Sequence, residues 1–277
     1  SHWLKQHYEE VWLVDFEYGC EPGELPEVRC VVARELFSQR LIRLWEDRLK
    51  VLPQPPFRTD QGALFVAYLA SAELGCFQVL GWSPPERILD LYVEFKRITG
   101  GLKLGSGRGL IGALTYFGLS SLEVAEKDSM RELALRGGHY DEKERTALLD
   151  YCQSDVDSLA KLLIAFANRI DLPRALLRGR YMVAVARMEE AGVPIDTTTL
   201  SKIIGEWESI KSEVVNKLDA NIGVYEGTSF KTQKFVDYLT RQRIAWPLLD
   251  SGRPALDDAT FRYMAAAYPE EIGPIRE

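Results

Sequence analysis

The sequence predicts an α/β domain followed by a mainly helical segment, and three observations support this fold class. Short apolar runs that are typical of strands alternate with helix-like segments over roughly the first 140 residues. From about residue 142 to residue 170 the apolar pattern is that of one long helix. After that point only helical patterns follow, so we expect one domain at residues 1–172 and a helical segment at 173–277.

The first hundred residues contain four expected strands and three expected helices. The strands are expected at 11–16, 28–34, 63–68 and 87–90, and the helices at 38–49, 71–82 and 91–99. The first of these helices is inferred from near-helical spacing of apolar residues, namely Phe37, Leu41, Leu44, Trp45 and Leu49. A Pro-rich loop covers 53–62, and a Gly-rich connection at 100–112 lacks the spacing of a P-loop.

Helical patterns dominate the remaining sequence. A helix before Gly192 and Pro194 carries an apolar stripe of Leu176, Tyr181, Val185 and Met188. A long amphipathic helix is expected at 197–222, with an apolar face of Leu200, Ile203, Ile204, Trp207, Ile210, Val214 and Leu218. Shorter helices are expected near 231–241 and 256–266.

The composition limits the classes of protein to which this chain could belong. The chain has 277 residues, of which 46% are hydrophobic and 27% charged, as in ordinary globular proteins. No apolar run reaches the ~20 residues of a membrane helix, and the polar N-terminus is no signal peptide. Four separated cysteines indicate reduced cytosolic thiols and argue against a zinc site. A formal net charge of −7 gives no electrostatic signature of a nucleic-acid binder.

Two carboxylates follow the first buried strand. In the stretch VWLVDFEYG, Asp15 and Glu17 lie two residues apart and therefore point to the same face of the strand. Two neighbouring acids repel each other unless a cation lies between them or one of them keeps a proton. This stretch therefore indicates a candidate cation site.

A second acidic motif lies in the long helix. In LLDYCQSDVDSL, Tyr151 and Asp155 are four residues apart and share one helix face, whereas Asp157 points elsewhere. An early strand ending in D-x-E, an acid after a middle strand and a late Y-x-x-x-D are the pattern of a two-metal phosphodiester hydrolase. Two Mg²⁺ or Mn²⁺ ions would bind such oxygen ligands, and the tyrosine hydroxyl would orient the attacking water.

These motifs resemble those of the DEDD superfamily of 3′→5′ exonucleases, in its tyrosine-bearing branch. VWLVDFEYG is similar to the first motif of that superfamily and YCQSDVDSL to its third. RMEEAGVPIDTTTL resembles the segment after the proofreading domain of family A DNA polymerases, the bacterial and phage DNA polymerase I-like family. SFKTQKFVDYL and the residues from 252 to 277 resemble part of the thumb that follows in those polymerases.

The second motif departs from the family pattern of N-x-x-x-D. Here Leu69 stands in place of the asparagine and Glu73 in place of the aspartate. Glu73 can still bind a divalent ion, although its longer side chain shifts the carboxylate. Asp90 is the alternative ligand, but by position it is more similar to the aspartate that ends the following strand in the family. We therefore favour Glu73.

The resemblance implies a ribonuclease H-like exonuclease domain that proofreads DNA. Asp15, Glu17, Glu73 and Asp155 would hold two divalent metal ions, with Tyr151 beside the water, and 5′-mononucleotides would leave a single-stranded or frayed 3′ end. The expected cell compartment is the cytoplasm of a bacterium or of a phage-infected bacterium. Candidate DNA contacts are Lys103 and Arg108 in the Gly-rich connection and Lys231 and Lys234 in the thumb-like segment.

No palm or fingers motif follows residue 197, so the chain is expected to lack a polymerase active site. Its abrupt end at GPIRE leads us to expect a piece of a longer polymerase. Two alternatives stay open. The altered second motif would suit a catalytically impaired scaffold or DNA-binding module, and the exonuclease motifs alone would also suit a ribonuclease D-like exoribonuclease.

Overall fold

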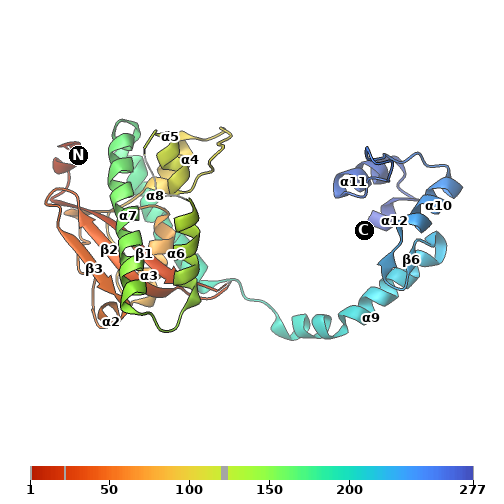
Figure 1. Cartoon of the computed structure of the whole chain (residues 1–277), viewed down its shortest axis with the longest axis horizontal. Coiled ribbons are helices and arrows are strands. Elements are labelled where there is room, and N and C mark those ends of the chain that lie inside the picture. Colours follow the sequence, from red (N-terminus) through yellow and green to blue (C-terminus); the bar gives the residue numbers. More distant parts are fainter. Residues whose placement is uncertain (1, 22, 120–123, 277) are drawn as a thin grey trace. The chain divides into compact units, whose positions relative to one another are not determined.

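The computed structural model describes residues 2–21, 23–119 and 124–276 (Figure 1). The chain divides into two compact units, Ser1–Gly192 and Val193–Glu277. The first unit therefore extends beyond the expected boundary at residue 172. The reason is that the helix which follows this point packs on the sheet of the first unit rather than starting a new one.

The first unit is built on a mixed five-stranded sheet with strand order β3-β2-β1-β4-β5. The strands are β1 (Glu10–Gly19), β2 (Glu27–Glu35), β3 (Leu41–Trp45), β4 (Ala63–Ala67) and β5 (Ile88–Asp90). Strands β1, β4 and β5 are parallel, whereas β2 is antiparallel to both of its neighbours. This mixed sheet flanked by helices is the α/β architecture that the sequence predicted.

Helices cover both faces of this sheet. They are α1 (His2–Lys5), α2 (Glu46–Leu49), α3 (Ala70–Val79), α4 (Leu91–Ile98), α5 (Leu110–Tyr116), α6 (Val124–Arg136), α7 (Glu142–Phe166), the short η1 (Ala167–Arg169) and α8 (Leu172–Ala191). Helix α7 lies across β1, β2 and β3 on one face, as Figure 1 shows, and α3 packs with α8 on the other. Helices α5 and α6 were not anticipated from the sequence.

The helix expected at 38–49 is wrong, because this segment forms strand β3 and the single turn α2. The Glu35 carboxylate accepts hydrogen bonds from the amides of Phe37 (2.9 Å) and Ser38 (2.5 Å), which closes a tight turn after β2. The turn places Leu41–Trp45 beside β2, and the ladder with that strand overrides the helical spacing of its apolar residues.

Helix α8 buries small residues rather than its large apolar stripe. Ala175, Gly179 and Ala186 are buried, whereas Tyr181 and Met188 are exposed. A Cβ atom at Gly179 would lie only 2.0 Å from the carbonyl oxygen of Ile88, so the helix backbone lies directly against β5. Glu94 of α4, also buried, pairs with Arg178 at 2.6 Å and fixes the helix further.

The second unit is mainly helical, as predicted. It contains α9 (Thr197–Ile222), the two-stranded ribbon of β6 (Tyr225–Glu226) and β7 (Ser229–Phe230), α10 (Thr232–Gln242), α11 (Asp258–Ala267) and α12 (Gly273–Arg276). Its core gathers around Phe235, Met264 and Ile272, and only the C-terminal part of α9 contributes to it. The apolar residues expected on one face of α9 are exposed from Leu200 to Val214.

Within the part of the chain that the structure describes, no helix has the length and apolar character required to cross a membrane.

Candidate active site

The candidate site forms where β1 extends beyond its parallel neighbour. Strand β4 pairs with β1 only as far as Leu13, opposite Val66, although β1 continues to Gly19. The backbone of β1 beyond Leu13 is therefore not covered by β4 on that side. Asp15 and Glu17 lie in this extension, and both are partly exposed. The chain leaving β4 turns there into α3.

Glu73 of α3 occupies the open edge of β1. Its side chain is only 3% exposed, and its carboxylate accepts a hydrogen bond from the backbone N–H of Phe16. Its Oε2 atom has no hydrogen-bond partner among the described residues. Burial raises the pKa of Glu73 well above its ordinary value, and the nearby charges of Asp15 and Glu17 raise it further.

Helix α7 brings Tyr151 and Asp155 to the same place. Burial is the main cause that raises the pKa of Tyr151, and the negative charges of Asp155, Glu17 and Asp15 add to it, as does a hydrogen bond with Asp155. These effects require that the phenol lie close to all three acids. The structure thus brings together the five side chains that the sequence singled out, namely Asp15, Glu17, Glu73, Tyr151 and Asp155.

Cys152 is a neighbour of this cluster that the sequence analysis did not anticipate. Its thiol donates a hydrogen bond of 3.2 Å to the carbonyl oxygen of Asp15. One ligand atom each from Asp15, Glu17 and Cys152 lie within 4.8 Å of one another. Burial raises the pKa of Cys152, so the thiol is held in its protonated form. Cys152 follows Tyr151 and lies three residues before Asp155, so Cys152 and Asp155 share one face of the helix. This spacing could have revealed Cys152 from the sequence.

Asp90 serves a different purpose from Glu73. Its carboxylate accepts hydrogen bonds from the amides of Tyr92 (2.9 Å) and Val93 (3.2 Å) at the start of α4. It also accepts from the amides of Leu69 (3.2 Å) and Ala70 (2.9 Å) at the start of α3. Asp90 therefore joins the N-termini of two helices, and its oxygens are already occupied by backbone donors.

The four basic residues expected to contact DNA have varied surroundings. Lys103 is exposed, whereas the Arg108 guanidinium donates to the carbonyl oxygens of Thr99 (3.2 Å) and Leu102 (2.9 Å) within its own loop. In the second unit, Lys231 and Lys234 both lie near Glu226, at 3.7 and 3.2 Å. These pairs lower the pKa of Glu226, with Lys234 making the larger contribution.

The acids of the site fit divalent metal ions. Carboxylate oxygens are the ligands that Mg²⁺ and Mn²⁺ prefer. A buried carboxylate oxygen without a hydrogen-bond partner, next to two further acids, is costly unless a proton or a cation compensates its charge. Asp15, Glu17 and Glu73, with Asp155 beside Tyr151, are the residues that could hold such ions.

Comparison with known proteins shows the fold of this chain. No protein-family profile and no curated protein sequence matches it. Among solved structures, the POL domain of Pol1 from M. smegmatis, in complex with DNA primer-template and dNTP, is similar over 98% of this chain with a TM-score of 0.51 and 13% identity. This chain spans 44% of that polymerase chain. RNase D from Escherichia coli, an exoribonuclease involved in structured RNA processing, matches over 94% of this chain and 78% of its own, with a TM-score of 0.44 and 13% identity.

Proposed function

We propose that the first unit is a 3′→5′ exonuclease that hydrolyses the terminal phosphodiester of a nucleic acid with two divalent metal ions. The observation that carries this proposal is the meeting of Asp15 and Glu17 from β1, Glu73 from α3 and the Tyr151–Asp155 pair from α7. The buried Glu73 Oε2 atom, which has no hydrogen-bond partner among the described residues, is an oxygen that a divalent ion could take as a ligand.

Each residue has a definite role in this proposal. Asp15, Glu17, Glu73 and Asp155 hold the ions, and Glu73 is the second-motif ligand because the oxygens of Asp90 are occupied by backbone amides. When bound, the ions supply an activated water and stabilise the leaving 3′-oxygen. Tyr151 remains a neutral phenol because its pKa is raised, so it orients the water by hydrogen bonding rather than by charge.

The proposed substrate is the single-stranded or frayed 3′ end of DNA, as in the proofreading domain of a family A polymerase. The RMEEAGVPID resemblance supports this choice, and the likeness to a polymerase over both units agrees with it at the level of fold. In this proposal the palm and fingers belong to a part of the polymerase outside this sequence. Lys103, Arg108, Lys231 and Lys234 are proposed to contact the DNA backbone.

Removal of one metal ligand tests the proposal. We expect Asp15→Ala to reduce Mg²⁺- or Mn²⁺-dependent digestion of a labelled single-stranded DNA oligonucleotide by at least about a hundred-fold. Asp157→Ala is the matched control, because Asp157 lies on α7 but pairs with Arg34 at 2.8 Å. Equal digestion by the wild type and by Asp15→Ala would refute the proposal. Faster digestion of a matched RNA oligonucleotide would assign the exonuclease to RNA instead.

Calorimetric titration with Mn²⁺ separates the enzyme from a non-catalytic scaffold. The wild type should bind two ions, and Glu73→Gln should bind fewer or bind them more weakly. A wild-type protein that binds no Mn²⁺ would support the scaffold, which the altered second motif keeps as the alternative.

A further inference from the structure

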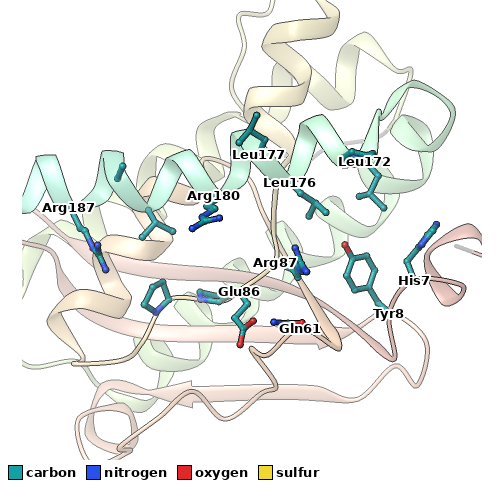
Figure 2. Close-up of a pocket in the computed structure, with 15 residues that line it drawn as sticks. His7, Tyr8, Gln61, Glu86, Arg87, Leu172, Leu176, Leu177, Arg180 and Arg187 are labelled. Carbon is teal, nitrogen blue, oxygen red and sulfur yellow. The ribbon is translucent and has the colours of Figure 1, made fainter.

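A groove lies at the edge of the first unit opposite the acid cluster. It is bounded by the residues before β1, β4 and β5 on one side and by one face of α8 on the other (Figure 2). The acids lie toward the carboxyl end of β1, and the groove lies at the amino ends of the same parallel strands. The stretch of β1 from Glu10 to Asp15, five residues at about 3.3 Å each, separates the groove from the acid cluster by about 17 Å. The groove is therefore distinct from the candidate active site.

The size of the groove suits a segment of protein. Its volume is about 1360 Å³, and its wall on α8 runs from Leu172 to Arg187. Fifteen residues of helix span about 22 Å at about 1.5 Å each. A wall of that length is as long as about four helical turns at about 5.4 Å each. Small-molecule pockets are usually smaller, at about 300–1,000 Å³.

The groove combines an apolar floor with positively charged side chains. Leu172, Leu176 and Val183 of α8 line it together with Pro84 and Pro85, and Leu177 in the same lining is 68% exposed. Arg180 and Arg187 extend from α8 toward the side that carries Glu86, as Figure 2 shows, and Arg87 lies near Tyr8.

These three arginines differ from their neighbours on the same elements. Arg87, Arg180 and Arg187 form no ion pair with any residue in the described ranges, and Glu86 is the one acid of the groove lining. By contrast, Arg178 on another face of α8 is paired with Glu94 at 2.6 Å. Arg180 and Arg187 are two turns apart on one helix face, about 10.5 Å along its axis. The groove therefore presents an excess of positive charge along its length.

We propose that this groove binds an acidic amphipathic helix of a partner protein. Leucine-type side chains of that helix would pack on the floor of the groove, and carboxylates spaced two turns apart would pair with Arg180 and Arg187. The apolar floor favours a protein over a nucleic-acid strand, because a single strand uses positive charge together with aromatic side chains for base stacking, and His7 is the one exposed aromatic side chain among the described lining residues. Tyr8, the one aromatic residue of this lining besides His7, is buried.

Fluorescence anisotropy with the full chain tests this proposal. The probe is a labelled 14-residue peptide with leucines at i, i+3, i+4 and i+7 and glutamates at most other positions. A second peptide carries lysines in place of the glutamates, and a single-stranded DNA and an RNA oligonucleotide, in EDTA, complete the set. We expect the acidic peptide to bind, more weakly at higher salt, and the lysine peptide not to bind.

Charge reversal locates the site. Arg180→Glu with Arg187→Glu should weaken binding of the acidic peptide at least ten-fold, and Arg87→Glu, on a different element, should weaken it in the same direction. Arg48→Glu is the matched control, since Arg48 is exposed on α2 and makes no ion pair with the described residues. These arginines are exposed, so circular dichroism of the variants should match that of the wild type.

Three outcomes would overturn the proposal. They are no binding of the acidic peptide, equal binding by the charge-reversed variants, and oligonucleotide binding that depends on Arg180 and Arg187 while the peptide does not bind. The last outcome would assign the groove to nucleic acid. Exonuclease activity serves as an independent measurement, because the double variant should digest DNA as the wild type does whether or not the peptide binds.

Discussion

At the scale of single residues, Leu69 shows how an unfavourable backbone conformation is held at the start of α3. This residue precedes α3 with φ of 72° and ψ of 61°, a left-handed conformation that costs a non-glycine residue about 1–2 kcal/mol. Its amide donates to Asp90, and its side chain is 41% exposed. The conformation thus persists because Asp90 holds the start of α3, and the leucine side chain adds little packing in return.

Asparagine tolerates the left-handed conformation better than leucine does. We therefore expect Leu69→Asn to raise the free energy of unfolding of the first unit by about 0.5–1 kcal/mol. Urea unfolding followed by tryptophan fluorescence measures it, because four of the six tryptophans lie in this unit. Leu69→Ala is the control and should give no gain, since alanine carries the same backbone cost. A destabilised Leu69→Asn protein would contradict this explanation.

At the scale of elements, the Glu35 carboxylate stabilises the turn after β2 and so allows the next segment to pair as strand β3. This carboxylate also accepts from the amide of Val11 at 3.0 Å, so it connects the turn to β1. Burial tends to raise the pKa of Glu35, but hydrogen bonds from Ser38, Val11 and Phe37 outweigh it, and the pKa lies below the ordinary value of 4.5. The ionised form of Glu35 is thus the one that stabilises the hairpin.

A carboxylate whose folded-state pKa is lowered stabilises the fold above its unfolded-state pKa, and this contribution disappears as the pH falls through the folded-state pKa. Glu35→Gln should therefore lower the free energy of unfolding by about 1.5–3 kcal/mol at pH 7, and the difference from the wild type should shrink below pH 4.5. Urea titrations between pH 7 and pH 3 measure this difference. Glu132→Gln, at an exposed position, should show no such trend, and a constant difference for Glu35→Gln would argue against the assigned role.

Local sequence patterns predicted most elements correctly, both in buried strands and in the exposed helix α9. The apolar runs of β1, β2 and β4 and the long helix α7 were all anticipated. The apolar pattern was misleading for β3, because the turn held by the Glu35 carboxylate and the pairing with β2 determine its structure. It also misassigned the buried face of α8, since the contact of Gly179 with Ile88 is made in three dimensions and selects small residues. The meeting of β1, α3 and α7 followed from motif order, whereas Cys152 and the groove did not.

At the scale of the whole molecule, the two units are joined by residues 193–196, which lie outside helices and strands. Val193 is 85% exposed and Ile195 is 67% exposed, so both apolar side chains are largely open to solvent. The adjoining helices are secured at their ends, because Gly192 closes α8 and the Asp196 carboxylate caps α9 through the amide of Thr199 at 3.0 Å. The connection is therefore the place where the chain offers an exposed backbone between two folded units.

Limited proteolysis with proteinase K should cleave first within this connection, because proteases require an exposed backbone that is free of regular hydrogen bonding. We expect two resistant fragments whose new termini, determined by mass spectrometry, lie at or next to residues 193–196. Each unit has its own core, so each fragment should keep its secondary structure by circular dichroism after separation. Early cleavage inside α8 instead would show that this helix is less firmly attached to β5 than the Gly179 contact and the Glu94–Arg178 pair indicate.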